Sequence, residues 1–376
     1  MKFKFKKLAV LAATGLLTLS MVTGCSSNIN TDAIVATVGD ENITLGVANF
    51  FARFQQGQYE SFYAGMMGMT PDTMWTQMLT GVENYETSVK ATIMDQLQDM
   101  VLISQHAEAY GVELSEADQA DIESAADGFL ANNSEEIVEI VSGQRANIIQ
   151  FLQWFTVSQR VSEAMRQGVD ENVSDEEAAQ KAIEFVFVPY ANTDEAGEVT
   201  QKTEEEIQDT LDTARTLLTQ VQENPDHDLS IFAAGFDVEV QDTTFDSEST
   251  SPNAELITAA NELTEVGQLT DIIETENGLF VAKLTSLLDR EATDVRIQEI
   301  ISGRQQDQFT SLLDQWREET EMTVVTSQWG QISFARQGIS FYQPAAEEHY
   351  EGDGHDHSTD DLTDEGDVYD ETGDAE

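Results

Sequence analysis

The sequence predicts an α+β protein in which a helical domain carries a small inserted α+β domain. Three observations predict this architecture. Apolar residues recur at helical spacing along much of residues 45–167, short strands and helices alternate between residues 184 and 284, and helical periodicity returns from Val295 to about Thr320. At 376 residues the chain is long enough for two or three domains with sizeable cores.

The first 25 residues indicate export and a lipid anchor. Four lysines precede a mostly apolar stretch from Leu8 to Val22, which is too short for an ordinary membrane-spanning helix but is typical of an export signal. Small residues then stand directly before Cys25, the single cysteine of the chain. This segment resembles the lipobox of bacterial lipoproteins, which implies that residues 1–24 are removed and that the sulfur of Cys25 carries a lipid. The alternative is a free cysteine in a signal that is cleaved elsewhere.

Changes in composition divide the rest of the chain. A polar tether of residues 25–32 leads into a helical domain of residues 33–177 and 290–342, and residues 178–289 form the inserted α+β domain. The tail of residues 343–376 has 14 acidic residues and no basic ones. We expect this tail to be disordered, because it cannot bury enough apolar surface to offset the entropy lost on ordering.

Local patterns predict the elements of the helical domain. β-Branched residues at 33–38 precede the turn signal Gly39-Asp40, which indicates a hairpin or a strand that enters a helix. Apolar residues at helical spacing predict helices over about residues 85–110, 115–130 and 144–167. Ser115 is a typical helix cap, and Gly111 and Gly168 are stop signals.

The inserted domain alternates between strands and helices. Strand patterns cover residues 185–188, 236–244 and 279–284, and helical patterns cover residues 204–222, 230–234 and 253–263. Within about 100 residues this order predicts one small α+β unit.

Several segments resemble the PrsA-type foldase lipoproteins and their periplasmic relative SurA. Val35-Ala-Thr-Val-Gly-Asp-Glu-Asn-Ile-Thr-Leu45 is similar to the opening segment of that family. Glu184-Phe-Val-Phe-Val188 and Asn277-Gly-Leu-Phe-Val-Ala-Lys-Leu284 are similar to the first and last strands of its parvulin prolyl isomerase domain. The resemblance implies a chaperone domain, built from N-terminal helices and one C-terminal helix, into which the parvulin domain is inserted.

The sequence departs from the parvulin pattern at the catalytic positions. The resemblance implies a histidine in each of the two strands, and these positions are Phe185 and Phe280 here. A phenylalanine ring can neither donate nor accept the hydrogen bonds that a histidine pair makes. The glycine-rich segment that builds the proline pocket is also missing, and Val240–Phe245 stands in its place. We therefore predict a parvulin-like scaffold with no catalytic residues, and the alternative is an active but divergent isomerase.

Residues 50–79 are rich in phenylalanine, tyrosine and methionine. Flexible methionines and large aromatic rings make adaptable surfaces for unfolded chains, and the alternative is ordinary packing in the core and in loops. The candidate client-binding residues are Phe50, Phe54, Phe62, Met66, Met67, Met69, Met74 and Trp75.

Charge and histidine content limit the partners. With a formal net charge of −53 the chain repels phosphate backbones, so we expect no nucleic-acid partner. In the tail, His349, His355 and His357 stand among aspartates and are weak candidates for metal ligands, against the alternative of incidental histidines in a solvated tail. We expect no bound metal and no cofactor.

Together these patterns predict a chaperone that is lipid-anchored on the extracytoplasmic face of the cell membrane. Its partners would be unfolded or nascent exported polypeptides, and a homodimer is compatible with the sequence. Two alternatives stay open, an active divergent prolyl isomerase and a surface binding or assembly lipoprotein with one tight partner.

Overall fold

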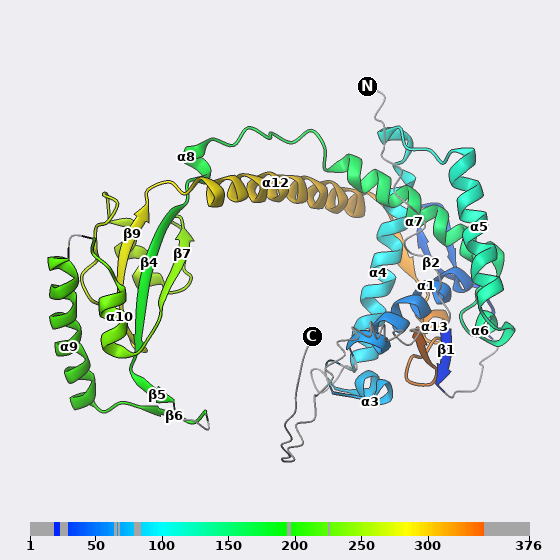
Figure 1. Cartoon of the computed structure of the whole chain (residues 1–376). Coiled ribbons are helices and arrows are strands. Elements are labelled where there is room, and N and C mark those ends of the chain that lie inside the picture. The colour runs from blue at the N-terminus through cyan, green and yellow to red at the C-terminus, as the bar shows by residue number, and fades with distance from the viewer. Residues whose placement is uncertain are drawn as a thin grey trace, which may run out of the picture.

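The part of the chain that the computed structural model describes comprises residues 19–22, 29–63, 66, 68–78, 84–193, 197–224 and 226–341. These residues form two lobes at opposite ends of one long helix, α12 (Arg290–Glu319), as Figure 1 shows. The first part of the chain and the segment after α12 build the helical lobe, and the middle of the chain builds the sheet lobe. The predicted α+β class, with a small α+β unit inserted into a helical domain, is confirmed. The exact domain boundaries stay a prediction.

A three-stranded sheet joins the beginning and the end of the helical lobe. Its antiparallel order is β10 (Met322–Val324), β2 (Ile34–Val38), β3 (Glu41–Thr44). The predicted turn between β2 and β3 is present, and Gly39 adopts a φ of 55°, which glycine tolerates without steric cost. The side chain of Thr44 then accepts a hydrogen bond from the N–H of Val47 and caps α1 (Leu45–Gln58).

Three longer helices pack with α1. They are α4 (Tyr85–Gln105), α5 (Glu116–Asn132) and α7 (Arg145–Met165). The predicted cap at Ser115 is present as a reciprocal pair, in which Ser115 and Asp118 each bond the backbone N–H of the other. The shorter elements of this lobe are η2 (Tyr59–Tyr63), α3 (Pro71–Thr76), η3 (Glu108–Tyr110), α6 (Glu135–Ile140) and α13 (Thr326–Trp329).

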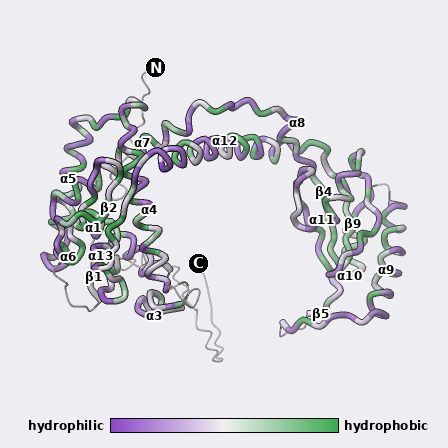
Figure 2. Tube along the Cα trace, turned by 180° about the vertical axis from the view of Figure 1, so that it is seen from behind, coloured by the Kyte–Doolittle hydropathy of each residue, from purple (hydrophilic) through white to green (hydrophobic). Residues whose placement is uncertain are grey.

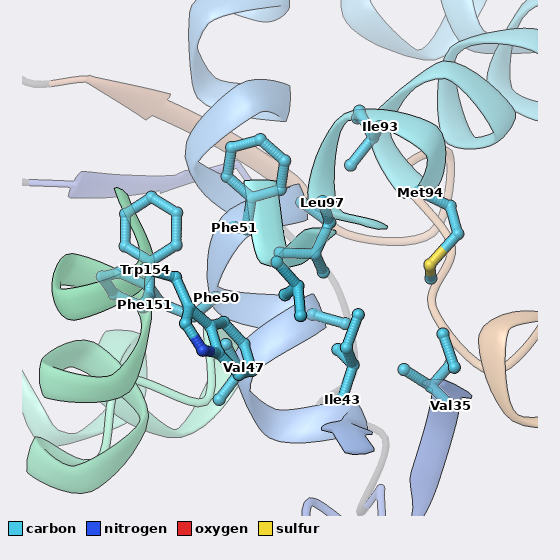
Figure 3. Close-up of a cluster of buried hydrophobic side chains, with 14 of the residues drawn as sticks. Val35, Ile43, Val47, Phe50, Phe51, Ile93, Met94, Leu97, Phe151 and Trp154 are labelled. Carbon is cyan, nitrogen blue, oxygen red and sulfur yellow. The ribbon is translucent and has the colours of Figure 1, made fainter. Parts of the chain in front are cut away.

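The core of the helical lobe lies where α1, α4 and α7 meet. Figure 3 shows Phe50 and Phe51 of α1 directed toward Phe151 of α7, with Leu97 of α4 nearby. The apolar spacing of each helix places these side chains on one face, and burial of such a face supplies most of the stability of a helix in a folded protein.

Helix α12 connects the two lobes. Its 30 residues span about 45 Å. Thr293 is buried near the first turns, and Leu313 and Trp316 are buried in the helical lobe, whereas Ile297, Ile300 and Ile301 between them are only half-buried. The segment that precedes the sheet lobe runs alongside and includes α8 (Asp175–Ala178).

The sheet lobe is built on four antiparallel strands in the order β7 (Val240–Phe245), β4 (Lys181–Pro189), β9 (Gly278–Ser286), β8 (Ile273–Glu274). Hydrophobic residues gather in β4 and β9 at the centre, as Figure 2 shows. Helices α9 (Glu204–Glu223) and α10 (Ser230–Phe236) cover one face, and α11 (Ala254–Asn261) covers the other. The strand predicted from Phe236 begins only at Val240, because Phe236 packs against Phe232 as the last residue of α10.

A further strand pair involves the predicted signal segment. β1 (Leu19–Val22) pairs antiparallel with β11 (Gly338–Phe341), and a small hairpin of β5 (Ala191–Thr193) and β6 (Val199–Gln201) extends from the sheet lobe. The predictions for Cys25, Met67, His349, His355, His357 and the acidic tail fall outside the described residues. Among the helices that the structure describes, none has both the length and the apolarity needed to cross a membrane.

Candidate functional site

A large apolar groove opens in the helical lobe. It has a volume of about 800 Å³ and lies between α1, α4, α5, α7 and α12. Seven phenylalanines line it: Phe50, Phe51, Phe54, Phe129, Phe151, Phe155 and Phe309. Ligand sites in proteins commonly have volumes of 300–1,000 Å³ and mostly apolar walls, so size and lining suit the binding of several apolar side chains.

Ring contacts between helices hold the floor of the groove. Phe51 stacks on Phe151 at 5.4 Å between ring centroids, and Phe50 meets the edge of Phe129 at 5.3 Å. These four rings are buried, whereas Phe54, Phe155 and Phe309 are only half-buried. The floor is therefore packed, and Phe54, Phe155 and Phe309 keep part of their ring surface exposed along the groove.

The rim of the groove is polar but carries little net charge. Arg317 donates to both carboxylate oxygens of Asp99, at 2.9 and 2.6 Å, and this pairing raises the pKa of the Arg317 guanidinium. The guanidinium carbon of Arg166 lies 3.9 Å from the centre of the Phe309 ring. Asp99 is the only acidic residue among the described groove residues, in a chain with 71 acidic side chains.

The polar side chains of the groove are mostly engaged with one another or with the backbone. Its described lining includes no histidine, cysteine or lysine, and the hydroxyl of Ser158 donates to the carbonyl of Phe155. Within the described residues, no group of three His, Cys, Asp or Glu side chains is arranged to hold a metal ion.

The structure separates the predicted client-binding residues. Phe50 and Phe54 line the groove. Phe62 and Met66 lie outside it and are exposed to 60% and 77%, while Met69 packs partly against the core.

The prediction that Met74 and Trp75 bind clients is wrong, since the structure buries both side chains completely. Trp75 donates to a carboxylate oxygen of Glu60 at 2.8 Å and stacks on Tyr85. Sequence reasoning in turn missed Phe129, Phe151, Phe155 and Phe309 as groove residues. Their helical spacing shows only that they face inward, not that space remains between the helices.

The two histidine-equivalent positions come together in the sheet lobe. Phe185 of β4 and Phe280 of β9 lie on the same face of the sheet, with 6.1 Å between ring centroids, and Phe187 lies 4.6 Å from Phe280. Phe185 and Phe280 are only 3% and 6% exposed, packed with Leu256 and Ile257 of α11. The place where the resemblance implies a polar catalytic pair is a packed aromatic cluster.

Comparisons with known proteins found similarity among solved structures alone. No family model matches the chain, and no curated protein matches it. The foldase PrsA of Streptococcus pneumoniae is 16% identical with a TM-score of 0.28, over 69% of this chain and 99% of that one. PrsA of Bacillus anthracis is 17% identical with a TM-score of 0.24, over 60% and 96%. A SurA-like chaperone of Campylobacter jejuni is 12% identical with a TM-score of 0.25, over 78% and 99%.

These solved structures are described as PrsA and SurA-like proteins.

Proposed function

We propose that this protein is an extracytoplasmic chaperone that holds apolar segments of unfolded exported polypeptides in the groove of its helical lobe. The observation that carries the proposal is the groove itself, with about 800 Å³ of space between aromatic walls. Solved proteins of similar fold are described as foldases and SurA-like chaperones, which is consistent with this role.

The chemistry of the groove suits varied clients. Aromatic walls accept apolar side chains of different shape, because dispersion and hydrophobic contacts are not directional. A nearly neutral rim does not repel an uncharged segment, while the strongly acidic remainder of the chain keeps the complex soluble by charge repulsion.

The parvulin-like lobe acts as a scaffold in this proposal. Buried Phe185 and Phe280 cannot supply the hydrogen bonds of a catalytic pair, and the rings fill the space between β4, β9 and α11. A lipid on Cys25 would hold the chaperone at the membrane where exported chains emerge, and a lipid anchor raises local concentration without any new protein contact.

The test is suppression of aggregation by the exported protein, with denatured citrate synthase and reduced insulin as unrelated clients. We expect the wild type to suppress both, and the double variant Phe155→Ala, Phe309→Ala to need at least about fivefold more protein for the same effect, since each truncation removes apolar contact area. Phe62→Ala removes an exposed ring outside the groove and is the matched control. Equal activity of the groove variant and the wild type would overturn the groove as the site.

A prolyl isomerase assay separates the enzymatic alternative. It uses residue–proline peptides, with a relative that retains both histidines as the positive control. We expect no acceleration by the purified protein. Measurable acceleration would instead support the divergent isomerase, and binding of one client alone would support the single-partner lipoprotein.

A further inference from the structure

Strand β11 is anchored to the helical lobe along one edge. Glu60 accepts a hydrogen bond from the N–H of Ile339 at 2.7 Å, and Gln56 and Arg53 donate to the carbonyl of Gln337 at 2.6 and 3.0 Å. Ile339 is completely buried. These contacts come from α1 and η2, so β11 has anchoring contacts that β1 does not supply.

The opposite edge of β11 is covered by the predicted signal segment. Leu19 to Val22 of β1 pair with Phe341 to Gly338, and Figure 1 shows β1 at the border of the helical lobe. Successive residues of a strand direct their peptide groups to opposite edges. Since the N–H of Ile339 points to Glu60, the peptide groups of Gly338 and Ser340 face β1.

A buried amide without a partner lies directly before this strand. Gln337 is 5% exposed, and neither its Nε2 nor its Oε1 has a hydrogen-bond partner. It lines a small cavity of about 60 Å³ together with Asn49 and Arg336. An orphaned carboxamide of this kind costs free energy unless a further polar group reaches it.

We propose that removal of residues 1–24 turns the free edge of β11 into a strand-addition site for an extended, uncharged segment of an exported polypeptide. The chain's own segment Leu-Ser-Met-Val occupies this edge of β11 and is uncharged, which indicates the kind of segment that the edge accepts. β11 itself, Gly-Ile-Ser-Phe, is also uncharged. The backbone of the incoming segment bonds the peptide groups of Gly338 and Ser340, as that of β1 does here. This inference rests on the proposed function and adds a second binding site to it. The two sites lie on different faces of α1, because Arg53 and Gln56 donate hydrogen bonds to the residue before β11 while Phe50 and Phe54 line the groove.

The test measures binding of a fluorescent peptide with the sequence of residues 16–24. The protein is compared in two forms, the full chain and the form recovered after export, whose N-terminus is read by mass spectrometry. We expect saturable binding to the exported form and at least about tenfold weaker binding to the full chain, because β1 competes for the same edge. An intact N-terminus after export, or equal binding to both forms, would overturn the proposal.

Proline substitutions in the peptide locate the edge without changing the protein. Ser20→Pro removes an N–H that faces β11 and should weaken binding about tenfold, whereas Met21→Pro removes an N–H that faces away and should change it less than about twofold. The same comparison can be made on the protein. Ser340→Pro removes an N–H that faces the bound strand and should weaken peptide binding, whereas Phe341→Pro removes an N–H that faces away and should change binding little. Equal loss with both peptide prolines would exclude strand addition. If the exported form binds no peptide but still suppresses aggregation, strand addition at β11 is refuted and the proposed function stands. If the Phe155→Ala, Phe309→Ala variant suppresses aggregation as well as the wild type, the proposed function fails instead.

Discussion

Glu60 accepts a 2.7 Å hydrogen bond from the backbone N–H of Ile339, a residue 279 positions later in the chain. The same carboxylate accepts from Gln56 and from the indole of Trp75. Burial raises the pKa of Glu60 and lowers the pKa of the neighbouring Arg53 to about 10. One buried polar cluster therefore fixes the last described strand to the first helix.

The Glu60→Gln variant tests this connection. A glutamine offers one acceptor oxygen and an NH₂ group, so at least one of the three buried donors loses its partner. We expect a loss of about 1–3 kcal/mol in the free energy of unfolding, together with faster amide exchange at Ile339.

Glu318→Gln removes the same charge at an exposed position and serves as the control for Glu60→Gln. Denaturant titration of both variants measures the free energy of unfolding, and hydrogen exchange measures the opening of the Ile339 amide. An unchanged exchange rate at Ile339 would contradict the anchoring role of Glu60.

Asp118 gives a prediction for low pH. Its carboxylate accepts from Arg160 at 2.6 and 2.9 Å and from Ser115, and the Arg160 hydrogen bonds are the main cause that lowers the pKa of Asp118. Because the folded-state pKa lies below that of the unfolded chain, the stabilisation is fully present above pH of about 4 and is lost as the pH falls toward the folded-state pKa.

We expect Asp118→Asn to cost about 2 kcal/mol at pH 7 and progressively less below pH 4. The matched control is Asp121→Asn on the exposed face of the same helix, for which little change is expected at either pH. Thermal unfolding across this pH range makes the comparison. A cost of Asp118→Asn that did not shrink with acid would argue against the ion pair as its source.

Gly278 gives a prediction for the packing of the sheet lobe. A Cβ at this position would lie 2.4 Å from the carbonyl oxygen of Val188 and 2.6 Å from the ring of Phe187. Gly278 begins β9 opposite Pro189, the last residue of β4, and the paired backbone there cannot move aside cheaply, so Gly278→Ala should destabilise the protein by about 2–3 kcal/mol.

Gly303→Ala is the matched control for Gly278→Ala. A Cβ at Gly303 meets nothing within 4 Å, and the residue lies on the exposed part of α12. Alanine favours the helix there, so we expect stabilisation by up to about 1 kcal/mol. Calorimetry of both variants gives the comparison, and equal effects of the two substitutions would mean that β9 is not packed as described.

Local sequence determined several of the elements and some of their ends. The hydroxyl of Ser115 and the turn at Gly39 act within a few residues, and the apolar run of β4 is visible in the sequence itself. All three can therefore be identified without knowing the rest of the chain. The motifs also paired Phe185 with Phe280, and the register of β4 with β9 then brought the two rings together.

The groove was decided by tertiary structure. Phe155 and Trp75 are both aromatic residues of helices, yet Phe155 is half-buried along the groove, whereas Trp75 is fully buried against Tyr85 and Phe334. Whether an apolar face is packed or left open depends on the distance to helices that come from far along the chain, here α1, α7 and α12. Spacing within one helix fixes the direction of a side chain, but only the arrangement of several helices fixes what it meets.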